Sequence, residues 1–154
     1  MRIISGIFKS RKIDPPAGLP VRPTTDRAKE AIFNILNTKL IADDRSWEDL
    51  RSLELFCGTG SISLEMISRG VENATMVDES KKCTQFIQKL AKEWKIDSQI
   101  RLLTMKAEAF VALPEQELYD LIFLDPPYKL ATKEDFILKI LKKPLLQSDG
   151  ILLI

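Results

Sequence analysis

The 154-residue sequence contains no histidine and only two cysteines, Cys57 and Cys83. Without histidine, the chain cannot form a Ser-His-Asp triad, a Cys-His catalytic pair or a metal site with histidine ligands. Two cysteines are too few for a disulfide framework or a cysteine-rich zinc site. We therefore expect no bound metal and no histidine-based acid–base catalysis.

Long hydrophobic runs are also missing. No apolar run approaches the ~20 residues that span a bilayer. The first six residues have neither a long apolar core nor a cleavage-site pattern, so we expect no secretory signal. Apolar residues make up 45% of the chain and charged residues 29%, which is ordinary for one globular domain with a single core. By default, we expect a cytoplasmic protein without a membrane contact.

The net charge is only +1, but basic residues are concentrated near the N-terminus. Residues 1–29 hold seven basic and two acidic side chains, a net charge of +5, against −4 for the remaining 16 basic and 20 acidic ones. Such a basic segment fits a surface that contacts nucleic-acid phosphates, and a merely solvated segment is the alternative. Six of the seven basic residues, all except Lys29, are candidate contacts for these phosphates: Arg2, Lys9, Arg11, Lys12, Arg22 and Arg27.

Residues 1–23 are predicted to form a small N-terminal extension, and residues 24–154 a single domain. Within the extension, Ile3–Ile4 and Ile7–Phe8 can form a short strand or pair as a hairpin with Gly6 in the turn. Three prolines and a glycine at 14–20 exclude regular structure there.

A helix is expected to begin after Thr24 or Thr25, because either side chain can cap it. Its apolar residues recur at i, i+3, i+4, i+7 and i+8, which predicts one buried stripe. That stripe consists of Ala28, Ala31, Ile32, Ile35 and Leu36.

From residue 51 onward, short apolar strands alternate with amphipathic helices. Strands are expected at 53–56, 74–77, 100–105, 119–124 and 151–154. Helices are expected between the glycine turn and Gly70, after Ser80, before Pro114 and at about 133–142. This alternation predicts an α/β, Rossmann-like fold with a mainly parallel sheet and helices on both faces. Such sheets bind ligands at the carboxyl ends of their strands.

The chain stops inside its expected fifth strand, at Ile154. We therefore expect that further C-terminal strands are missing, so that 24–154 is a domain truncated at its C-terminus.

A glycine turn follows the first expected strand, in the run Glu54-Leu55-Phe56-Cys57-Gly58-Thr59-Gly60. Its glycines allow a tight turn and the close approach of a ligand. Ser63 stands where a dinucleotide fingerprint has its third glycine, so a pyrophosphate loop is incompletely matched. S-adenosylmethionine has no phosphate and needs a carboxylate for its cationic amino-acid end; a plain strand-to-helix turn is the alternative. The candidate cofactor-binding residues here are Glu54, Phe56, Gly58, Thr59 and Gly60.

Two later carboxylates are further candidates for cofactor binding. Asp78 ends the second expected strand about 20 residues after the glycine turn, where a carboxylate can accept hydrogen bonds from ribose hydroxyls. Glu79 is the weaker choice there, and a solvated acidic loop is the alternative. Glu108, after the third strand, is a candidate for the adenine amino group, with an exposed helix residue as its alternative.

The run Asp125-Pro126-Pro127-Tyr128 follows directly after the fourth expected strand. An exocyclic amine on a purine is a poor nucleophile, because its lone pair is delocalised into the ring. Hydrogen bonds to Asp125 and to the Pro126 carbonyl would favour the pyramidal, nucleophilic state. The prolines would hold these acceptors rigid, and Tyr128 would stack on a base drawn out of its own stack. A rigid loop is the alternative.

Neither cysteine is interpreted as a nucleophile. Cys57 lies in the glycine turn rather than after the fourth strand, so packing is the preferred interpretation. The helix expected after Ser80 has an apolar stripe that predicts its buried face. The stripe consists of Cys83, Phe86, Ile87, Leu90, Ala91 and Trp94.

Several blocks of the chain resemble the bacterial family of 16S ribosomal RNA guanine-N2 methyltransferases. The most distinctive is Arg22-Pro23-Thr24-Thr25-Asp26-Arg27 with the helix 30–36 that follows it. The N-terminal run Arg2 to Gly6 with Arg11-Lys12, the cofactor strand with its helix to Gly70, and the loop at 123–128 are also similar. The match covers nearly the whole chain.

The resemblance implies a class I methyltransferase fold and S-adenosylmethionine-dependent methylation of one guanine at N2. It also implies that the substrate is an assembled or protein-bound small-subunit particle, and that 125–128 is the catalytic loop. Glu54 replaces the family's commoner Asp, and Cys57-Gly58-Thr59-Gly60 its commoner Ala-Gly-Ser-Gly.

Three alternatives remain open. DNA adenine-N6 methylation uses the same amino-group chemistry. A protein glutamine methyltransferase fits less well, since Asn rather than Asp usually opens its loop. The third is a non-catalytic, cofactor-binding RNA module that assists ribosome assembly.

Overall fold

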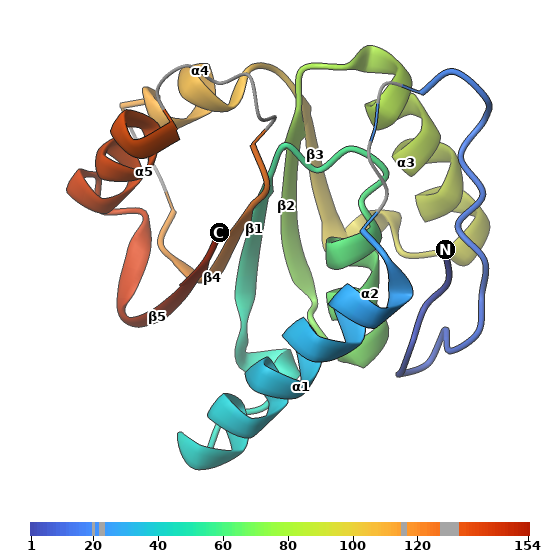
Figure 1. Cartoon of the computed structure of the whole chain (residues 1–154), viewed down its shortest axis with the longest axis horizontal. Helices are drawn as coiled ribbons and strands as arrows, with labels where there is room; N and C mark the ends of the chain where they lie inside the picture. Colours follow the sequence, from blue (N-terminus) through green and yellow to red (C-terminus); the bar gives the residue numbers. More distant parts are fainter. Residues whose placement is uncertain (20, 22–23, 115–116, 127–132) are drawn as a thin grey trace.

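The computed structural model of the chain describes residues 1–19, 21, 24–114, 117–126 and 133–154 (Figure 1). Its helices and strands alternate as the sequence predicts. In chain order they are α1 (Asp26–Ala42), the 3-10 turn η1 (Trp47–Asp49), β1 (Arg51–Leu55), α2 (Ser61–Arg69), β2 (Asn73–Asp78), α3 (Lys81–Trp94), the 3-10 turn η2 (Asp97–Gln99), β3 (Ile100–Thr104), α4 (Ala107–Val111), β4 (Tyr119–Leu124), α5 (Lys133–Lys142) and β5 (Leu146–Leu153).

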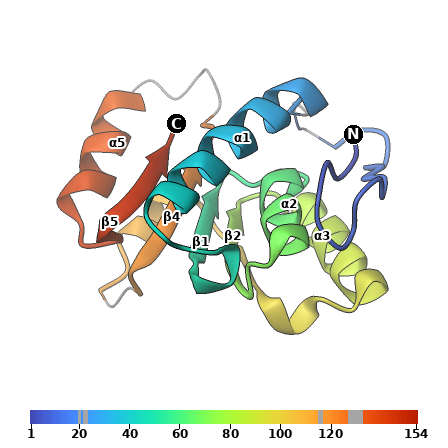
Figure 2. The ribbon, with the colours of Figure 1, turned by 90° about the horizontal axis from the view of Figure 1, so that it is seen from below.

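The strands form one sheet in the order β3-β2-β1-β4-β5, and every neighbouring pair is parallel. The chain winds from β1 outward to β3 and then returns to β4 on the other side of β1. Helices cover both faces, with α1, α2 and α3 on one and α4 and α5 on the other (Figure 2). The predicted Rossmann-like α/β architecture is therefore confirmed, and the reversal of strand order lies between β1 and β4, where such sheets bind ligands.

The buried face of α1 differs from the predicted stripe. Thr25 caps the helix as expected, its hydroxyl accepting a hydrogen bond from the backbone N–H of Ala28 at 3.2 Å. Of the predicted stripe only Leu36 is buried; Ile35 is 67% exposed. The buried residues are Lys29, Phe33, Leu36 and Leu40. Apolar residues lie on more than one face of this helix, so the apolar pattern does not identify the buried face. That face also contains a buried lysine, Lys29, which an apolar pattern does not include.

The N-terminal extension is part of the core. Ile3, Phe8 and Ile13 are buried in the same apolar cluster as the inner faces of α1 and α2. The predicted pairing of Ile3–Ile4 with Ile7–Phe8 is wrong; instead Arg2 bridges Lys12. The physical reason is that side chains of α2 form hydrogen bonds with the backbone N–H and carbonyl groups of this segment, as described below.

The charged residue of β4, Asp120, is held by partners from elsewhere in the chain. One carboxylate oxygen lies 2.5 Å from the Arg45 guanidinium, and the other accepts a hydrogen bond from the backbone N–H of Arg51 at 2.8 Å. Asp120 thus ties the amino end of β4 to the start of β1. Among the described residues, no helix is both long and apolar enough to cross a membrane.

Candidate active site

A cleft of about 790 Å³ opens at the carboxyl ends of the strands. Its walls come from the segments that follow β1, β2, β3 and β4, and from Val21 and Thr24 just before α1. Eight predicted site residues meet there: Glu54, Phe56, Gly58, Thr59, Asp78, Glu108, Asp125 and Pro126. Gly60 is not among the lining residues, and Pro127 and Tyr128 lie outside the described residues.

The glycine turn bends sharply away from β1. Phe56, Gly58 and Gly60 all have positive φ, at 60°, 53° and 71°. A Cβ atom on Gly60 would lie 2.4 Å from the Met76 side chain, so this glycine allows the turn to pack against β2. Phe56 is the strained position, since a bulky side chain at positive φ is uncommon and such strain clusters at functional sites. The turn therefore presents Gly58, rather than Gly60, to the cleft.

Glu54 places a buried carboxyl group in the wall of the cleft. Its side chain is only 3% exposed, and one carboxylate oxygen accepts a hydrogen bond from the backbone N–H of Ser63, in the first turn of α2, at 2.9 Å. Burial raises the pKa of Glu54 to about 7, although the hydrogen bond from Ser63 opposes the shift. Because burial disfavours its ionised form, this carboxylate gains free energy from a cationic ligand group beside it.

Asp78 connects two loops of the cleft. One carboxylate oxygen accepts a hydrogen bond from the backbone N–H of Gly58 and the other from that of Ser80, each at 2.8 Å. The side chain that the sequence assigned to ribose binding thus also fixes the glycine turn and the start of α3. Each carboxylate oxygen can accept a further hydrogen bond, so ribose contact is compatible with this role. Glu79, the weaker candidate, is exposed and also lines the cleft.

Asp125 follows β4 on the other side of the cleft from Asp78. Leu55 of β1 and Leu124 of β4 are register partners. The segments that follow these two strands therefore leave the sheet side by side, at Phe56 and Asp125. Asp125 is exposed and Pro126 is buried. The exposed carboxylate of Asp125, followed by a buried proline, is thereby placed next to the glycine turn.

Cys57 and Cys83 are both free and buried, as their interpretation as packing residues predicts. Burial raises the pKa of the Cys57 thiol, and the nearby Glu54 and Asp78 carboxylates raise it further. A thiol with a raised pKa is a poor nucleophile at neutral pH.

Several lining residues were not predicted as part of the site, among them Val21, Thr24 and Lys106. A Cβ atom on Gly58 would lie 3.2 Å from the Val21 side chain, so Val21 packs over the glycine turn. The position of Thr24 in the most distinctive sequence block was a signal that could have found it. Lys106 follows β3 at the same end of the sheet as the predicted residues, and that placement was the available signal.

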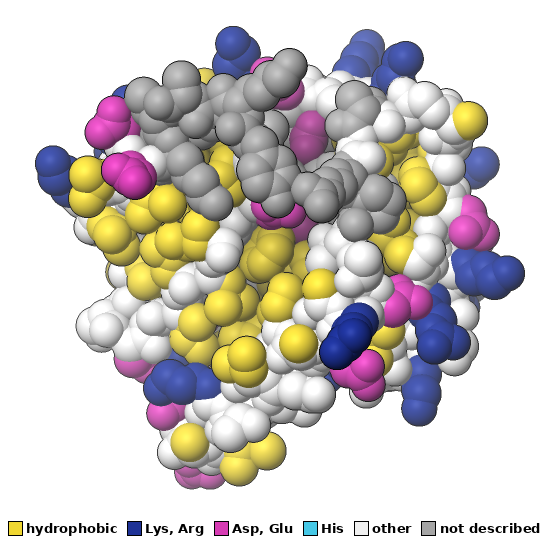
Figure 3. All heavy atoms as spheres, in the orientation of Figure 1, with side chains coloured by type: hydrophobic (Ala, Val, Ile, Leu, Met, Phe, Trp, Pro, Cys, Tyr) yellow, Lys and Arg dark blue, Asp and Glu magenta, His cyan; other side chains and the backbone are white. Residues whose placement is uncertain are grey.

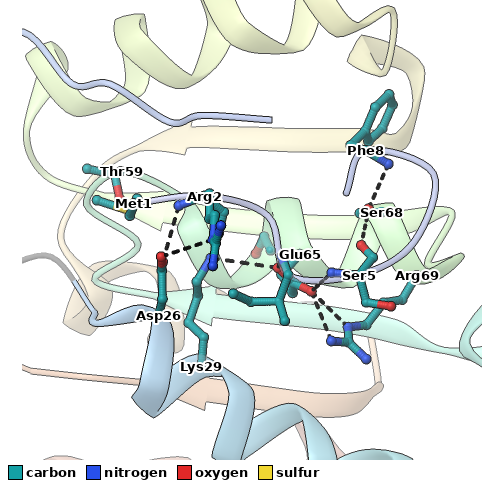
Figure 4. Close-up of polar contacts among 12 residues, drawn as sticks. Met1, Arg2, Ser5, Phe8, Asp26, Lys29, Thr59, Glu65, Ser68 and Arg69 are labelled. Carbon is teal, nitrogen blue, oxygen red and sulfur yellow. Dashed lines mark hydrogen bonds and ion pairs between the residues drawn. The ribbon is translucent and has the colours of Figure 1, made fainter. Parts of the chain in front are cut away.

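The N-terminal segment is held onto the domain by buried polar groups (Figure 4). The Glu65 carboxylate of α2 accepts hydrogen bonds from the backbone N–H groups of Ile4 and Ser5, at 2.7 and 2.9 Å. The Ser68 hydroxyl donates to the Ser5 carbonyl and accepts from the backbone N–H of Phe8. These hydrogen bonds use backbone N–H and carbonyl groups that would have paired the two strands of the predicted hairpin.

The predicted nucleic-acid contacts divide into three groups. Lys9, Arg11, Lys12 and Arg27 are exposed. Arg2 is exposed but lies 3.5 Å from the Asp26 carboxylate. Arg22 lies outside the described residues. Lys29, which contributed to the basic count, is fully buried and faces Glu65, so it cannot contact a phosphate.

Comparisons with known proteins agree with the fold. The family model described as "Conserved hypothetical protein 95" matches residues 1–154. The chain is 34% identical over 152 residues to "Putative rRNA methyltransferase YlbH" of Bacillus subtilis, which covers 97% of this chain and 79% of that protein. It is 30% identical over 137 residues to "Ribosomal RNA small subunit methyltransferase D" of Escherichia coli, which covers 89% of this chain. The match spans 65% of the E. coli protein, just under two thirds of its length.

Solved structures show the same fold. "Putative methyltransferase yhhF" from Escherichia coli superposes with a TM-score of 0.82 at 27% identity, over 99% of this chain and 78% of that one. A putative methylase from Haemophilus influenzae superposes with a TM-score of 0.75 at 25% identity, over 98% of this chain and 78% of that one.

Proposed function

The chain belongs to the family described as Conserved hypothetical protein 95, and from that premise we propose that it is an S-adenosylmethionine-dependent methyltransferase of small-subunit ribosomal RNA. We further propose that the methyl group goes to the exocyclic N2 of a guanine. The observation that carries the proposal is that Glu54, Asp78 and Asp125, from three strands, line one cleft. Its similarity to proteins described as rRNA methyltransferases supports the rRNA substrate.

The cleft suits the parts of the cofactor. S-adenosylmethionine, when bound, supplies a methyl group activated by its sulfonium. Glu54 would hold the cationic amino-acid end, because this buried carboxyl group is stabilised in its ionised form by a nearby cation. Asp78 would accept hydrogen bonds from the ribose hydroxyls, and Glu108 from the adenine amino group. Gly58 allows the ligand to approach the backbone closely.

Asp125 and Pro126 would prepare the attacking nitrogen. The Asp125 carboxylate and the Pro126 carbonyl would accept hydrogen bonds from the amino group of the base. These bonds draw the nitrogen lone pair out of conjugation and aim it at the methyl group, so that positioning supplies most of the rate enhancement. From their residue types, Pro127 stiffens the loop and Tyr128 stacks on the flipped base. No histidine base is needed.

The N-terminal residues would hold the RNA, which is present as an assembled or protein-bound particle. In this division residues 1–23 contribute phosphate contacts together with Arg27 in the first turn of α1, and residues 24–154 bind the cofactor and catalyse transfer. The proposed contacts are Arg2, Lys9, Arg11, Lys12, Arg22 and Arg27. Contacts of this kind position the RNA without reading its sequence.

The test is methyl transfer from labelled S-adenosylmethionine to immature small subunits, with DNA as the competing substrate. We expect transfer to the rRNA by the wild-type chain. Asp125→Ala should abolish transfer while S-adenosylmethionine binding stays within about twofold, because Asp125 faces the base. Transfer to DNA alone would favour the adenine-N6 alternative. Cofactor binding without transfer to any substrate would favour the non-catalytic module.

A further inference from the structure

The outer face of α3 carries a stripe of lysines. Lys81, Lys82, Lys89 and Lys92 are all exposed. At 100° per residue they fall within about one third of the helix circumference, opposite the buried stripe that contains Cys83 and Trp94. The sole acidic residue from 81 to 95 is Glu93, which lies at the border of this face.

These lysines are not neutralised within the described part of the chain. The ion pairs there engage Arg2, Lys29, Lys39, Arg45, Arg51 and Arg69, and none involves a lysine of α3. Exposed basic side chains elsewhere, such as Lys39 beside Asp43, have a carboxylate partner. The positive charge of α3 is therefore available to an external partner.

The basic turn of the N-terminal segment lies directly against this helix. The Phe8 and Trp94 rings are 5.2 Å apart, and the Arg11 guanidinium lies 4.8 Å from the Phe8 centroid and 5.4 Å from that of Trp94. Arg11 remains exposed, so its N–H groups can still donate to a phosphate while the rings hold its plane. Lys9 and Lys12 flank it in sequence and are also exposed.

The two groups of basic residues thus occupy one side of the molecule. Figure 3 shows lysine and arginine side chains along the edge where α3 and the N-terminal segment lie, on the right of the view. Ser80, which caps α3, lines the cleft, so the lysine face begins beside the cleft and extends about 17 Å along the helix from Lys81 to Lys92. A nucleic-acid backbone bound along the lysine face of α3 would therefore reach the cleft.

We propose that the lysine face of α3 and the turn at Lys9–Lys12 form one surface that binds the phosphate backbone of the substrate RNA. This inference rests on the proposed function. It extends the contact from the N-terminal segment to a helix whose basic residues the charge count of the sequence did not single out. A polyanionic backbone is the partner that fits, because the surface offers a row of exposed cations that make no ion pair within the described part of the chain.

The test compares two double charge reversals of equal size. Lys89→Glu with Lys92→Glu changes the α3 face. Lys139→Glu with Lys142→Glu makes the same change in charge on α5, on the other face of the sheet, where both lysines are exposed. The probe is deproteinised small-subunit rRNA, bound over a series of KCl concentrations. Thermal unfolding and S-adenosylmethionine binding check that both variants keep the fold.

We expect the α3 variant to bind rRNA at least tenfold more weakly, with a slope of log K against log salt that is smaller by about 1.5. Arg11→Glu with Lys12→Glu should reduce the slope in the same way, and the α5 variant should stay near the wild type. Equal slopes for the α3 and α5 variants would overturn the inference. So would an α3 variant that binds naked rRNA normally and fails only on assembled subunits, because its partner would then be a protein.

Binding and methyl transfer are measured separately, which distinguishes the two proposals. If the wild-type chain methylates rRNA and the α3 slope is unchanged, the surface proposal fails and the proposed function stands. If rRNA binding depends on α3 and only DNA is methylated, the proposed function fails and the surface stands. If the wild-type chain binds neither deproteinised rRNA nor assembled small subunits, both fail.

Discussion

The Nζ atom of Lys29 lies 3.6 Å from an oxygen of Glu65, and neither side chain is exposed. Burial lowers the pKa of Lys29, and the nearby Glu65 and Asp26 carboxylates act in the opposite direction. Lys29 also donates a hydrogen bond to the Arg2 carbonyl at 2.5 Å, while Glu65 binds the next backbone N–H groups. One buried pair thus joins the N-terminal segment to α1 and α2.

Lys29→Met should destabilise the protein by about 2 kcal/mol, because it leaves the Arg2 carbonyl without its hydrogen-bond donor and the buried Glu65 carboxylate with Arg69, at 3.0 Å, as its cationic partner. Urea unfolding measures the change. Lys139→Met, at an exposed site on α5, is the control and should change the free energy of unfolding by less than about 0.5 kcal/mol. Equal stabilities for the two variants would show that the pair does not hold the segment.

Gly60→Ala should destabilise the fold by about 2 kcal/mol, because the cost of a left-handed backbone is added to the displacement of the buried Met76 and Ile87 side chains. Gly18→Ala is the matched control. Its φ of 84° is also left-handed, but a Cβ atom there meets nothing within 4 Å, so only the backbone cost of about 1 kcal/mol is expected. A similar loss at both positions would refute the close packing of the glycine turn.

Glu54 should make the stability of the unliganded protein fall as the pH rises. The folded-state pKa is about 7, against 4.5 for the ordinary carboxyl group. Its contribution is therefore complete below pH 4.5 and is lost as the pH rises to about 7. The difference amounts to about 3 kcal/mol. Urea unfolding of wild type and Glu54→Gln across this range measures it; parallel pH profiles would contradict the prediction.

S-adenosylmethionine binding should tighten over the same titration. If ionised Glu54 holds the cationic end of the cofactor, the Kd falls about tenfold from pH 6 to pH 8, following the ionised fraction. Glu54→Gln should bind weakly with a flat profile, measured by calorimetry. A wild-type profile as flat as that of the variant would remove Glu54 from the cofactor site.

Much of the fold was predictable because strands and helices have different apolar periods. The strand at 119–124 and the helix at 133–142 have the predicted bounds, and the family resemblance is confirmed by the family model. The cleft was predictable in outline, since the carboxyl ends of parallel strands meet at one edge. Asp78 and Asp125 lie there because each directly ends or follows a strand.

The errors have a common physical cause: contacts between segments far apart in sequence. Lys29 was counted with the basic residues of the N-terminal segment because its partner Glu65 is 36 positions away, and no local pattern shows that pairing. The hairpin prediction was wrong because the same Glu65 carboxylate accepts hydrogen bonds from the backbone N–H groups of Ile4 and Ser5. Val21 reaches the cleft only because the N-terminal segment folds over the glycine turn.

The identity of the methylated nucleoside tests the central claim most directly. Small subunits incubated with the chain and methyl-labelled S-adenosylmethionine are digested to nucleosides and analysed by mass spectrometry. The account predicts label in N2-methylguanosine from the rRNA, and no such label with Asp125→Ala. Label in any other nucleoside, or an undiminished N2-methylguanosine signal from Asp125→Ala, would contradict it.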